Sequence, residues 1–385
     1  MANNQEVTNV WFFDKIKSAL AGIIVWPILI IISVYMLWSN EFSYVAREKA
    51  ILEGENIVVE VDAKNPTSEN NNKYVYTFWE VSSNPVQEPD FGFPINAAVV
   101  SRMVEMYQWS EKSQTEVKEN LGWSETHTTT YSYEKKWSQS AINSSDFNQA
   151  ADHQNPTNWK YESKVEFGQT PKLWSFNIAD KLQFALPAST DLKLWEEVKN
   201  LLSTGSTLVN NFIYTGVDYN TPQIGDLRIS YKVLPIGTTL SALAGQRNND
   251  ILDVYLLDSG DNITRIEEGN KSAKILFQAM KDDNSITTWI MRAVFTIVIF
   301  VWFSMLFSIL PTLWSVVPFL GKIVGVWVWL IAFVGTLIVA GWTIAIAWFA
   351  ARPIVSIIIL VIIAGAIFAV KKFKTNKQNT HVWVS

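Results

Sequence analysis

The chain has 385 residues, of which 49% are hydrophobic and 13% aromatic, and it carries a formal net charge of −5. This aromatic-rich composition is typical of a protein that lies partly in a membrane, and the acidic balance excludes a general basic surface for nucleic acid. The absence of cysteine excludes disulfides, thiolate nucleophiles and cysteine-ligated zinc.

The first apolar segment covers residues 19–38 and contains no charged residue. A helix of ~20 residues is long enough to cross the ~30 Å hydrocarbon layer of a membrane. The segment is too long for a cleaved signal peptide, and no small-residue cleavage site follows it. We therefore predict a retained transmembrane helix at 19–38, preceded by a cytoplasmic N-terminus at 1–18.

Residues 39–290 are more polar, and their pattern predicts a strand-rich α+β domain. Runs of β-branched and aromatic residues predict strands at 56–61, 73–81, 101–109, 126–137 and 225–234. We expect 126–137 to pair with 101–109, or to lie beside it, with the polar residues 110–125 at the tip of the hairpin. Amphipathic patterns predict helices at 189–202 and 272–280.

Three further apolar segments predict transmembrane helices at 291–310, 326–349 and 354–370. The intervening residues 311–325 contain two prolines and are too short to span a membrane, so we predict an interfacial, cytoplasmic or re-entrant turn. The predicted fold is thus a large strand-rich domain with four transmembrane helices, one N-terminal and three C-terminal.

Basic residues flank the first and last of these helices. Lys15 and Lys17 precede the first, and the tail 371–385 is rich in lysine. The positive-inside rule therefore predicts that both termini are cytoplasmic and that residues 39–290 lie on the other side of the membrane.

Motifs for catalysis are absent from the sequence. The three histidines lack zinc-site spacing, and there is no phosphate loop, dinucleotide-binding motif or serine-hydrolase motif. Asp258 and Asp261 could bind calcium, but a glycine-containing turn is the preferred interpretation. We expect no enzyme activity, no cofactor and no metal site.

Acidic residues leave one enzyme hypothesis open. Glu105 and Glu111 could form an acid/base pair, and Asp226 and Asp250 are further candidate acids. A salt-bridged solvent face is the preferred interpretation, because Glu105 and Glu111 are six residues apart on or near a strand.

The apolar helices contain small residues at helical spacing but no Asp, Glu or His at mid-span, which argues against ion-coupled transport. Gly321 and Gly325 form one small-residue pair, and Gly341 and Ala345 form another. Such pairs allow helices to pack closely, either within one chain or between two chains. A pore between helices remains an alternative function.

Several long motifs resemble those of the LUMA family, the transmembrane protein 43 family. They are VEMYQWSEK at 104–112, YSYEKKWSQSAINSSDFN at 131–148, HQNP at 153–156, IGDLRISY at 224–231, TTWIMRA at 287–293, and the pair Arg352 and Pro353. The resemblance implies one N-terminal helix, a large luminal or extracytoplasmic domain and three C-terminal helices.

The resemblance also implies a role. Animal members of the family reside in the endoplasmic reticulum and inner nuclear membrane, self-associate and organise membrane protein complexes, and no catalytic residue carries over. The cysteine-free composition indicates a bacterial member, with its domain in the periplasm. We therefore expect a scaffold whose partners are further copies of itself, other membrane proteins and membrane lipids.

Two groups of residues are candidates for this role. The candidate interface residues are Arg102, Glu105, Met106, Tyr107, Trp109, Tyr131, Tyr133 and Trp137. The candidate helix-packing residues are Gly321, Gly325, Gly341, Ala345, Arg352 and Pro353.

Overall fold

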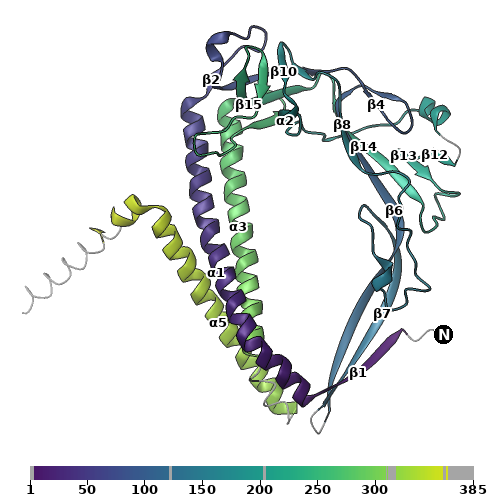
Figure 1. The fold of residues 1–385 in the computed structure, drawn as a ribbon, viewed down its shortest axis with the longest axis vertical. Helices are drawn as coiled ribbons and strands as arrows, with labels where there is room; N and C mark the ends of the chain where they lie inside the picture. Colours follow the sequence, from purple (N-terminus) through teal and green to yellow (C-terminus); the bar gives the residue numbers. More distant parts are fainter. Residues whose placement is uncertain are drawn as a thin grey trace, which may run out of the picture. The chain divides into compact units, whose positions relative to one another are not determined.

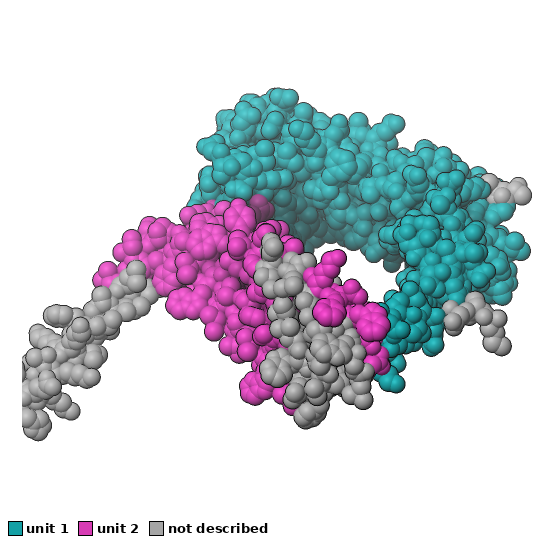
Figure 2. Space-filling view, turned by 60° about the horizontal axis from the view of Figure 1, so that its bottom comes forward, with its two compact units in different colours: residues 1–9, 50–118, 126–280 teal, residues 10–49, 119–125, 281–385 magenta. Residues whose placement is uncertain are grey.

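The computed structural model describes residues 4–120, 124–202, 205–308, 310, 318–358 and 361–362 (Figure 1). The chain divides into two compact units, which Figure 2 shows in different colours. The first unit consists of residues 1–9, 50–118 and 126–280, and the second of residues 10–49, 119–125 and 281–385. The fold is mixed, with a strand-rich first unit and long apolar helices in the second.

Three long helices contain the longest apolar segments of the described chain. They are α1 (Phe12–Ile57), α3 (Ala273–Leu306) and α5 (Pro318–Ala351). Within them, Val25–Ile57, Ala273–Leu306 and Ile323–Ala351 are long and apolar enough to cross a membrane. A helix rises 1.5 Å per residue, so the 46 residues of α1 extend about 70 Å, more than twice the hydrocarbon thickness.

The three helices run side by side in the second unit, with α3 antiparallel to the other two (Figure 1). Leu37 of α1, Ile299 of α3 and Ala340 of α5 form a buried cluster between them. Trp26 and Trp302 stack at a ring distance of 5.4 Å. These contacts fill the interior of the described bundle with apolar side chains.

An ion pair between Glu41 and Arg292 joins α1 to α3, one helical turn beyond Leu37 on α1. Nε and Nη2 of Arg292 donate to the two carboxylate oxygens of Glu41 at 2.6 and 2.7 Å. Glu41 is fully buried, so this two-pronged pairing supplies the compensation that a buried carboxylate requires.

The larger sheet of the first unit follows the order β1-β7-β6-β14-β13-β12, with β8 beside β6 and β11 beside β14. Its strands are β1 (Gln5–Trp11), β6 (Ala97–Asn120), β7 (Ser124–Ser138), β8 (Lys164–Phe167), β11 (Thr190–Asp191), β12 (Ser206–Val209), β13 (Phe212–Thr215) and β14 (Leu227–Pro235). Strands β6 and β14 pair antiparallel, with Val104 opposite Ile229. Both are fully buried in one apolar cluster of this sheet.

A second sheet follows the order β17-β15-β16-β10-β9-β3-β2 and also pairs β15 with β3. Its strands are β2 (Val59–Glu60), β3 (Tyr74–Ser82), β9 (Lys172–Leu173), β10 (Phe176–Ile178), β15 (Thr239–Arg247), β16 (Ile251–Asp253) and β17 (Arg265–Glu268). Val99 of β6 packs in the same buried cluster as Val81 and Leu240 of this sheet, so side chains of both sheets share a core.

Short elements complete the first unit. They are the strand pair β4 (Val86–Gln87) and β5 (Pro94–Ile95), the helix α2 (Asp180–Gln183), and the 3-10 helices η1 (Ser68–Asn70), η2 (Ser144–Asp146) and η3 (Glu196–Leu201). The ends of α1 and α3 pack against the second sheet, where Ile51 and Phe277 are buried beside Tyr74.

The sequence located most strands but misplaced several boundaries. The predicted strands 73–81, 101–109, 126–137 and 225–234 correspond to β3, β6, β7 and β14, although β3 and β14 begin one and two residues later than predicted, and β6 pairs with β7. The predicted tip at 110–125 is wrong, because β6 continues to Asn120. The strand predicted at 56–61 shrinks to β2, because α1 continues to Ile57.

Three helix predictions need correction. The helix predicted at 189–202 is instead β11 followed by η3, because Thr190 and Asp191 pair with β14 and use strand rather than helix geometry. The helix 272–280 and the crossing 291–310 are one continuous helix, α3, ending at Leu306. Of the predicted turn 311–325, residues 318–325 are helical and belong to α5, whereas 311–317 lie outside the described residues.

The fourth predicted transmembrane helix, 354–370, lies mostly outside the described residues. Residues 353–358 and 361–362 are helical. Among the described residues, three helices meet the length and hydropathy expected of a membrane span.

The pairing of β1 with β7 differs from the predicted topology. The amide of Tyr131 donates to the carbonyl of Asn4 at 2.8 Å, and the Thr126 hydroxyl donates to Asn9 at 3.0 Å. This pairing requires β1 and β7 to lie on the same side of a membrane. The predicted topology places them on opposite sides, because a single crossing by α1 would separate residues 1–18 from 39–290.

Candidate functional site

The signature segment, residues 102–112, lies on the long strand β6, and its side chains alternate between two environments from Arg102 to Ser110. Arg102, Val104, Met106, Gln108 and Ser110 are buried, and the residues between them are partly exposed. This period of two is the normal consequence of strand geometry, which points successive side chains to opposite faces. The segment therefore has an inner face in the core and an outer face on the hairpin.

The inner face begins with a buried ion network. Nη1 of Arg102 donates to Glu88 at 2.6 Å and also contacts Asp90, while its Nε donates to the carbonyl of Glu162 at 2.9 Å. Arg102 and Glu88 are only 4% and 2% exposed. The other oxygen of Glu88 accepts from the amides of Asp90 and Phe91, both at 2.7 Å. Arg102 thus stabilises the fold from inside, and it is not available as a surface contact.

Tyr231 of β14 completes this network by donating its hydroxyl to Glu88 at 3.3 Å. Burial, reinforced by the negative charge of Glu88, raises the pKa of Tyr231 above the ordinary value of 10.0. The tyrosine therefore remains a neutral hydrogen-bond donor to the carboxylate that pairs with Arg102.

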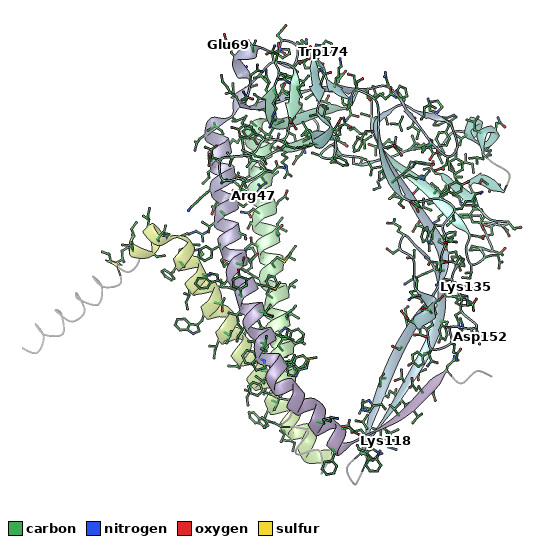
Figure 3. All side chains as sticks on the ribbon, viewed as in Figure 1. Arg47, Glu69, Lys118, Lys135, Asp152 and Trp174 are labelled. Carbon is green, nitrogen blue, oxygen red and sulfur yellow. The ribbon has the colours of Figure 1, made fainter. Side chains whose placement is uncertain are left out.

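The outer face carries an aromatic cluster shared with β7 and the loop that follows it. The His153 ring stacks on Tyr133 at 3.6 Å and meets Trp109 edge-on at 4.7 Å. The Lys135 ammonium lies 4.7 Å from the centre of the Trp109 ring, a favourable cation–π geometry. Figure 3 labels Lys135 on β7 and Asp152 in the following loop, on the same stretch of the hairpin.

A second aromatic group lies toward β14. Tyr107 and Trp137 pack at a ring distance of 5.1 Å, and the Arg228 guanidinium lies 4.6 Å above Trp137. Arg228 also donates to Glu105, its directly opposite cross-strand partner, at 2.6 Å. The paired charges therefore hold the cation over the indole ring.

Polar groups of the signature segment fasten the following loop, residues 139–156, which we call the docked loop. Gln108 is fully buried, donates to the carbonyl of Ser140 at 3.1 Å and accepts from the amide of Ile142 at 2.9 Å. The side chain of Asn155 accepts from the amide of Trp109 at 2.7 Å and donates to the carbonyl of the same residue at 2.9 Å. This exchange extends the edge of β6 as another strand would.

Glu111 and Tyr133 fasten the middle of the docked loop. The Tyr133 hydroxyl donates to Glu111 at 2.7 Å and accepts from the amide of Gln149 at 3.0 Å, and the amide of Asn148 donates to Glu111 at 2.7 Å. Desolvation and the hydrogen bond to Glu111 raise the pKa of Tyr133 to about 12.

The structure brings together only part of the predicted interface group. Tyr107 meets Trp137, and Trp109 meets Tyr133 through His153. Met106 is in the core, and Tyr131 donates to Glu6 of β1 at 2.9 Å. The sequence did not reveal the fastening roles of Gln108 and Asn155, although both lie within the quoted motifs.

The acid residues of the enzyme hypothesis each have a structural partner. Glu105 pairs with Arg228, Glu111 accepts from Tyr133, Asp226 accepts from the amide of Gln223, and Asp250 accepts from Asn177. Glu105 and Glu111 are separated by about 20 Å of strand, given ~3.3 Å per residue.

The loop containing Asp258 and Asp261 is confirmed as a turn. Gly260 has a φ of +85°, a conformation that glycine adopts without strain, and its amide donates to the carbonyl of Leu257 at 2.8 Å. Ser259 donates to the Asp261 carboxylate at 2.8 Å.

The predicted helix-packing pair of Gly341 and Ala345 lies away from the face of α5 that contacts the bundle, so within the described residues it does not pack α5 against α1 or α3. The face of α5 that contacts the bundle is marked by the buried residues Val328, Ala332, Thr336, Ala340, Thr343 and Ala347. Gly341 and Ala345 lie on the exposed side, and a Cβ added at Gly341 would meet nothing within 4 Å. Gly325 is partly buried near the start of α5, and the surroundings of Gly321 lie outside the described residues.

Arg352 and Pro353 directly follow α5. Arg352 donates to Glu48 of α1 at 3.3 Å, and Trp348 and Tyr44 lie 5.0 and 5.4 Å from its guanidinium. Arg352 thus ties the end of α5 to α1, and Pro353 is the first residue of the next helical stretch.

Comparisons with known proteins place these features in a family context. The family described as Transmembrane protein 43 matches residues 106–353. The chain is 25% identical over 358 residues to transmembrane protein 43 of Rattus norvegicus, covering 89% of the chain and 88% of the relative. It is 25% identical over 363 residues to that of Homo sapiens, covering 90% and 89%.

A more distant relative supports the same assignment. The transmembrane protein 43 homolog of Drosophila melanogaster is 24% identical over 300 residues, covering 73% of the chain and 74% of the relative. No solved structure matches the chain.

Proposed function

Because the chain belongs to the transmembrane protein 43 family, we propose that this membrane protein self-associates and organises membrane protein complexes without catalysing a reaction. The observation that carries the proposal is a hollow on the exposed face of α5. The hollow has a volume of about 340 Å³ and is lined by Leu337, Ile338, Gly341, Trp342 and Ala345.

Its shape suits close helix packing. Gly341 and Ala345 are four residues apart and lack long side chains, so another helix backbone can approach closely at this point. Trp342, which is 66% exposed, projects beside them. One patch therefore carries both a hollow and a projection, as a self-complementary two-fold contact requires. We assign a second copy of α5 as its occupant.

The first unit supports the scaffold role in a different way. Its signature residues are bonded to one another and to the docked loop, which gives a long hairpin with a fixed surface. Positioning partner proteins requires such a surface, and the partners here are further copies and other membrane proteins.

The proposed orientation follows the positive-inside rule, with the strand-rich domain on the side away from the cytoplasm. For a bacterial inner membrane this side is the periplasm, and the cysteine-free composition supports a bacterial source. For a eukaryotic source the membrane is that of the endoplasmic reticulum or the inner nuclear membrane. In this orientation β1 leaves β7 when α1 crosses the membrane, because Gln5–Trp11 then lies on the cytoplasmic side.

A pore, the alternative role, would have to form between copies. Leu37, Ile299 and Ala340 occupy the interior of the described bundle within one chain.

The test uses the full chain with the single substitution Val217→Cys, a site that is 97% exposed, labelled with donor or acceptor dye. Energy transfer is measured in liposomes as the ratio of protein to lipid is lowered. We expect Gly341→Leu to raise the protein density needed for half-maximal transfer by about tenfold, because the leucine fills the hollow.

Gly335→Leu is the matched control. Gly335 lies on the same helix outside the hollow, and a Cβ there also meets nothing within 4 Å. If both variants associate like the wild type, the contact is not at Gly341. If the wild type shows no transfer at any density, self-association is wrong.

A further inference from the structure

We propose that a polar cavity in the second unit binds the phosphate of a phospholipid headgroup. The cavity has a volume of about 190 Å³ and contains two arginines, Arg292 and Arg352. A water molecule occupies ~30 Å³ of liquid, so the cavity has room for a group several times larger. This inference does not depend on self-association.

The cavity lies at the level where lipid headgroups are expected. Tyr44 follows the end of the apolar segment 19–38 of α1, and Trp289 precedes the apolar segment predicted at 291–310, which begins within α3. Trp348 lies in the last turn of α5. Tyrosine and tryptophan concentrate at this level because their rings are apolar and their edges can hydrogen bond.

Arg352 provides the main argument for an anion. Its Nη1 is buried and has no hydrogen-bond partner among the described residues, while Nη2 reaches Glu48 at 3.3 Å. A guanidinium has five N–H donors, and a buried donor without a partner is unfavourable. Tyr44 and Trp348 pack around the guanidinium and restrict its position. An entering oxyanion would supply the missing acceptor.

Arg292 adds a second positive group to the cavity lining. Nε and Nη2 are taken by Glu41, which leaves the Nη1 donors outside that pair. Trp289 lies 4.5 Å from the guanidinium. Phosphate oxygens bind arginine well because the planar fork matches two of them at once.

Nearby carboxylates limit but do not cancel this attraction. Glu41 is fully buried against Arg292 and does not line the cavity. Glu48 accepts a hydrogen bond from Arg352 at 3.3 Å, and its side chain is 41% exposed. Because this contact is long and open to solvent, a phosphate could replace Glu48 as the partner of Arg352. The Thr288 hydroxyl also lines the cavity, although it donates to the carbonyl of Asn284 at 2.8 Å and so could offer only its oxygen lone pairs.

The experiment uses the full chain in detergent, titrated with dihexanoyl phosphatidylglycerol and observed by native mass spectrometry. We expect the wild type to bind one lipid more tightly than the others, and Arg352→Gln to weaken that step by about tenfold. Arg352→Lys keeps the charge but not the fork, so it should recover part of the affinity. Lys49→Gln is the matched control, because exposed Lys49 lies on α1 without lining the cavity.

Competition experiments on the wild-type chain identify the ligand even if the variants fail to fold. In these experiments a second compound is tested for its ability to displace the bound lipid. Dihexanoylglycerol, which lacks phosphate, should not compete, and inorganic phosphate should compete only at far higher concentration. Equal competition by dihexanoylglycerol would make this an apolar site, and equal competition by inorganic phosphate would make it a small-anion site. Either result, or wild-type affinity in folded Arg352→Gln, overturns the proposal.

Discussion

The buried ion network of the signature segment gives the sharpest prediction for stability. Replacing Arg102 by methionine removes the guanidinium but leaves the Glu88 carboxylate, which is 2% exposed, without its cation. Removing one partner of a buried ion pair costs about 3–5 kcal/mol. We expect the lower end, about 3 kcal/mol, because Glu88 retains the amides of Asp90 and Phe91 as donors.

The melting temperature of the strand-rich unit is measured in the full chain, with near-ultraviolet circular dichroism as the signal. For domains of ~150–250 residues, each 1 kcal/mol shifts Tm by about 2–4 °C, so Arg102→Met should lower Tm by about 6–12 °C. Lys112→Met is the control on the same strand, because Lys112 is 65% exposed and its ion pair with Glu134 contributes at most ~1 kcal/mol. Equal shifts for the two variants would refute the structural role of Arg102.

Two other predictions concern the hairpin. The pKa of Tyr133 is raised to about 12, so the folded chain keeps a proton that the unfolded chain loses near pH ~10. The free energy of unfolding should therefore decline between about pH 10 and about pH 12. Urea unfolding should show a shallower decline for Tyr133→Phe, which has no hydroxyl to titrate. In native membranes, the double variant Asn9→Cys and Thr126→Cys should form no disulfide on oxidation, because α1 separates the two sites in the proposed orientation. A disulfide there would show that β1 stays on β7 and that the cytoplasmic assignment of residues 1–18 is wrong.

The central strands could be predicted from the sequence because a strand with one buried face alternates apolar and polar residues with a period of two. In 130–137, Tyr131, Tyr133 and Trp137 are partly buried, while Ser132 and Glu134 are exposed, as the alternation indicates. The full length of β6 was not predictable in this way, because residues 111–120 are polar except for Val117 and pair with a neighbouring strand.

Long-range pairing explains what the sequence did not reveal. Arg102 finds Glu88 on the connection after β4, and Arg292 finds Glu41 across two helices, so neither pair has a local signal. The exposed position of Gly341 likewise depends on which face of α5 meets α1 and α3. The spacing of Gly341 and Ala345 was visible in the sequence. Only the packed bundle shows that this pair lies on the exposed face of α5, whereas Ala340 lies on the buried face.

Native mass spectrometry of the wild-type chain, released from its own membrane in lipid nanodiscs, tests the central claim most directly. The proposed role predicts a defined homo-oligomer, alone or with further membrane proteins bound. A uniform monomer without partners, at the protein density of the native membrane, would contradict self-association and scaffolding together.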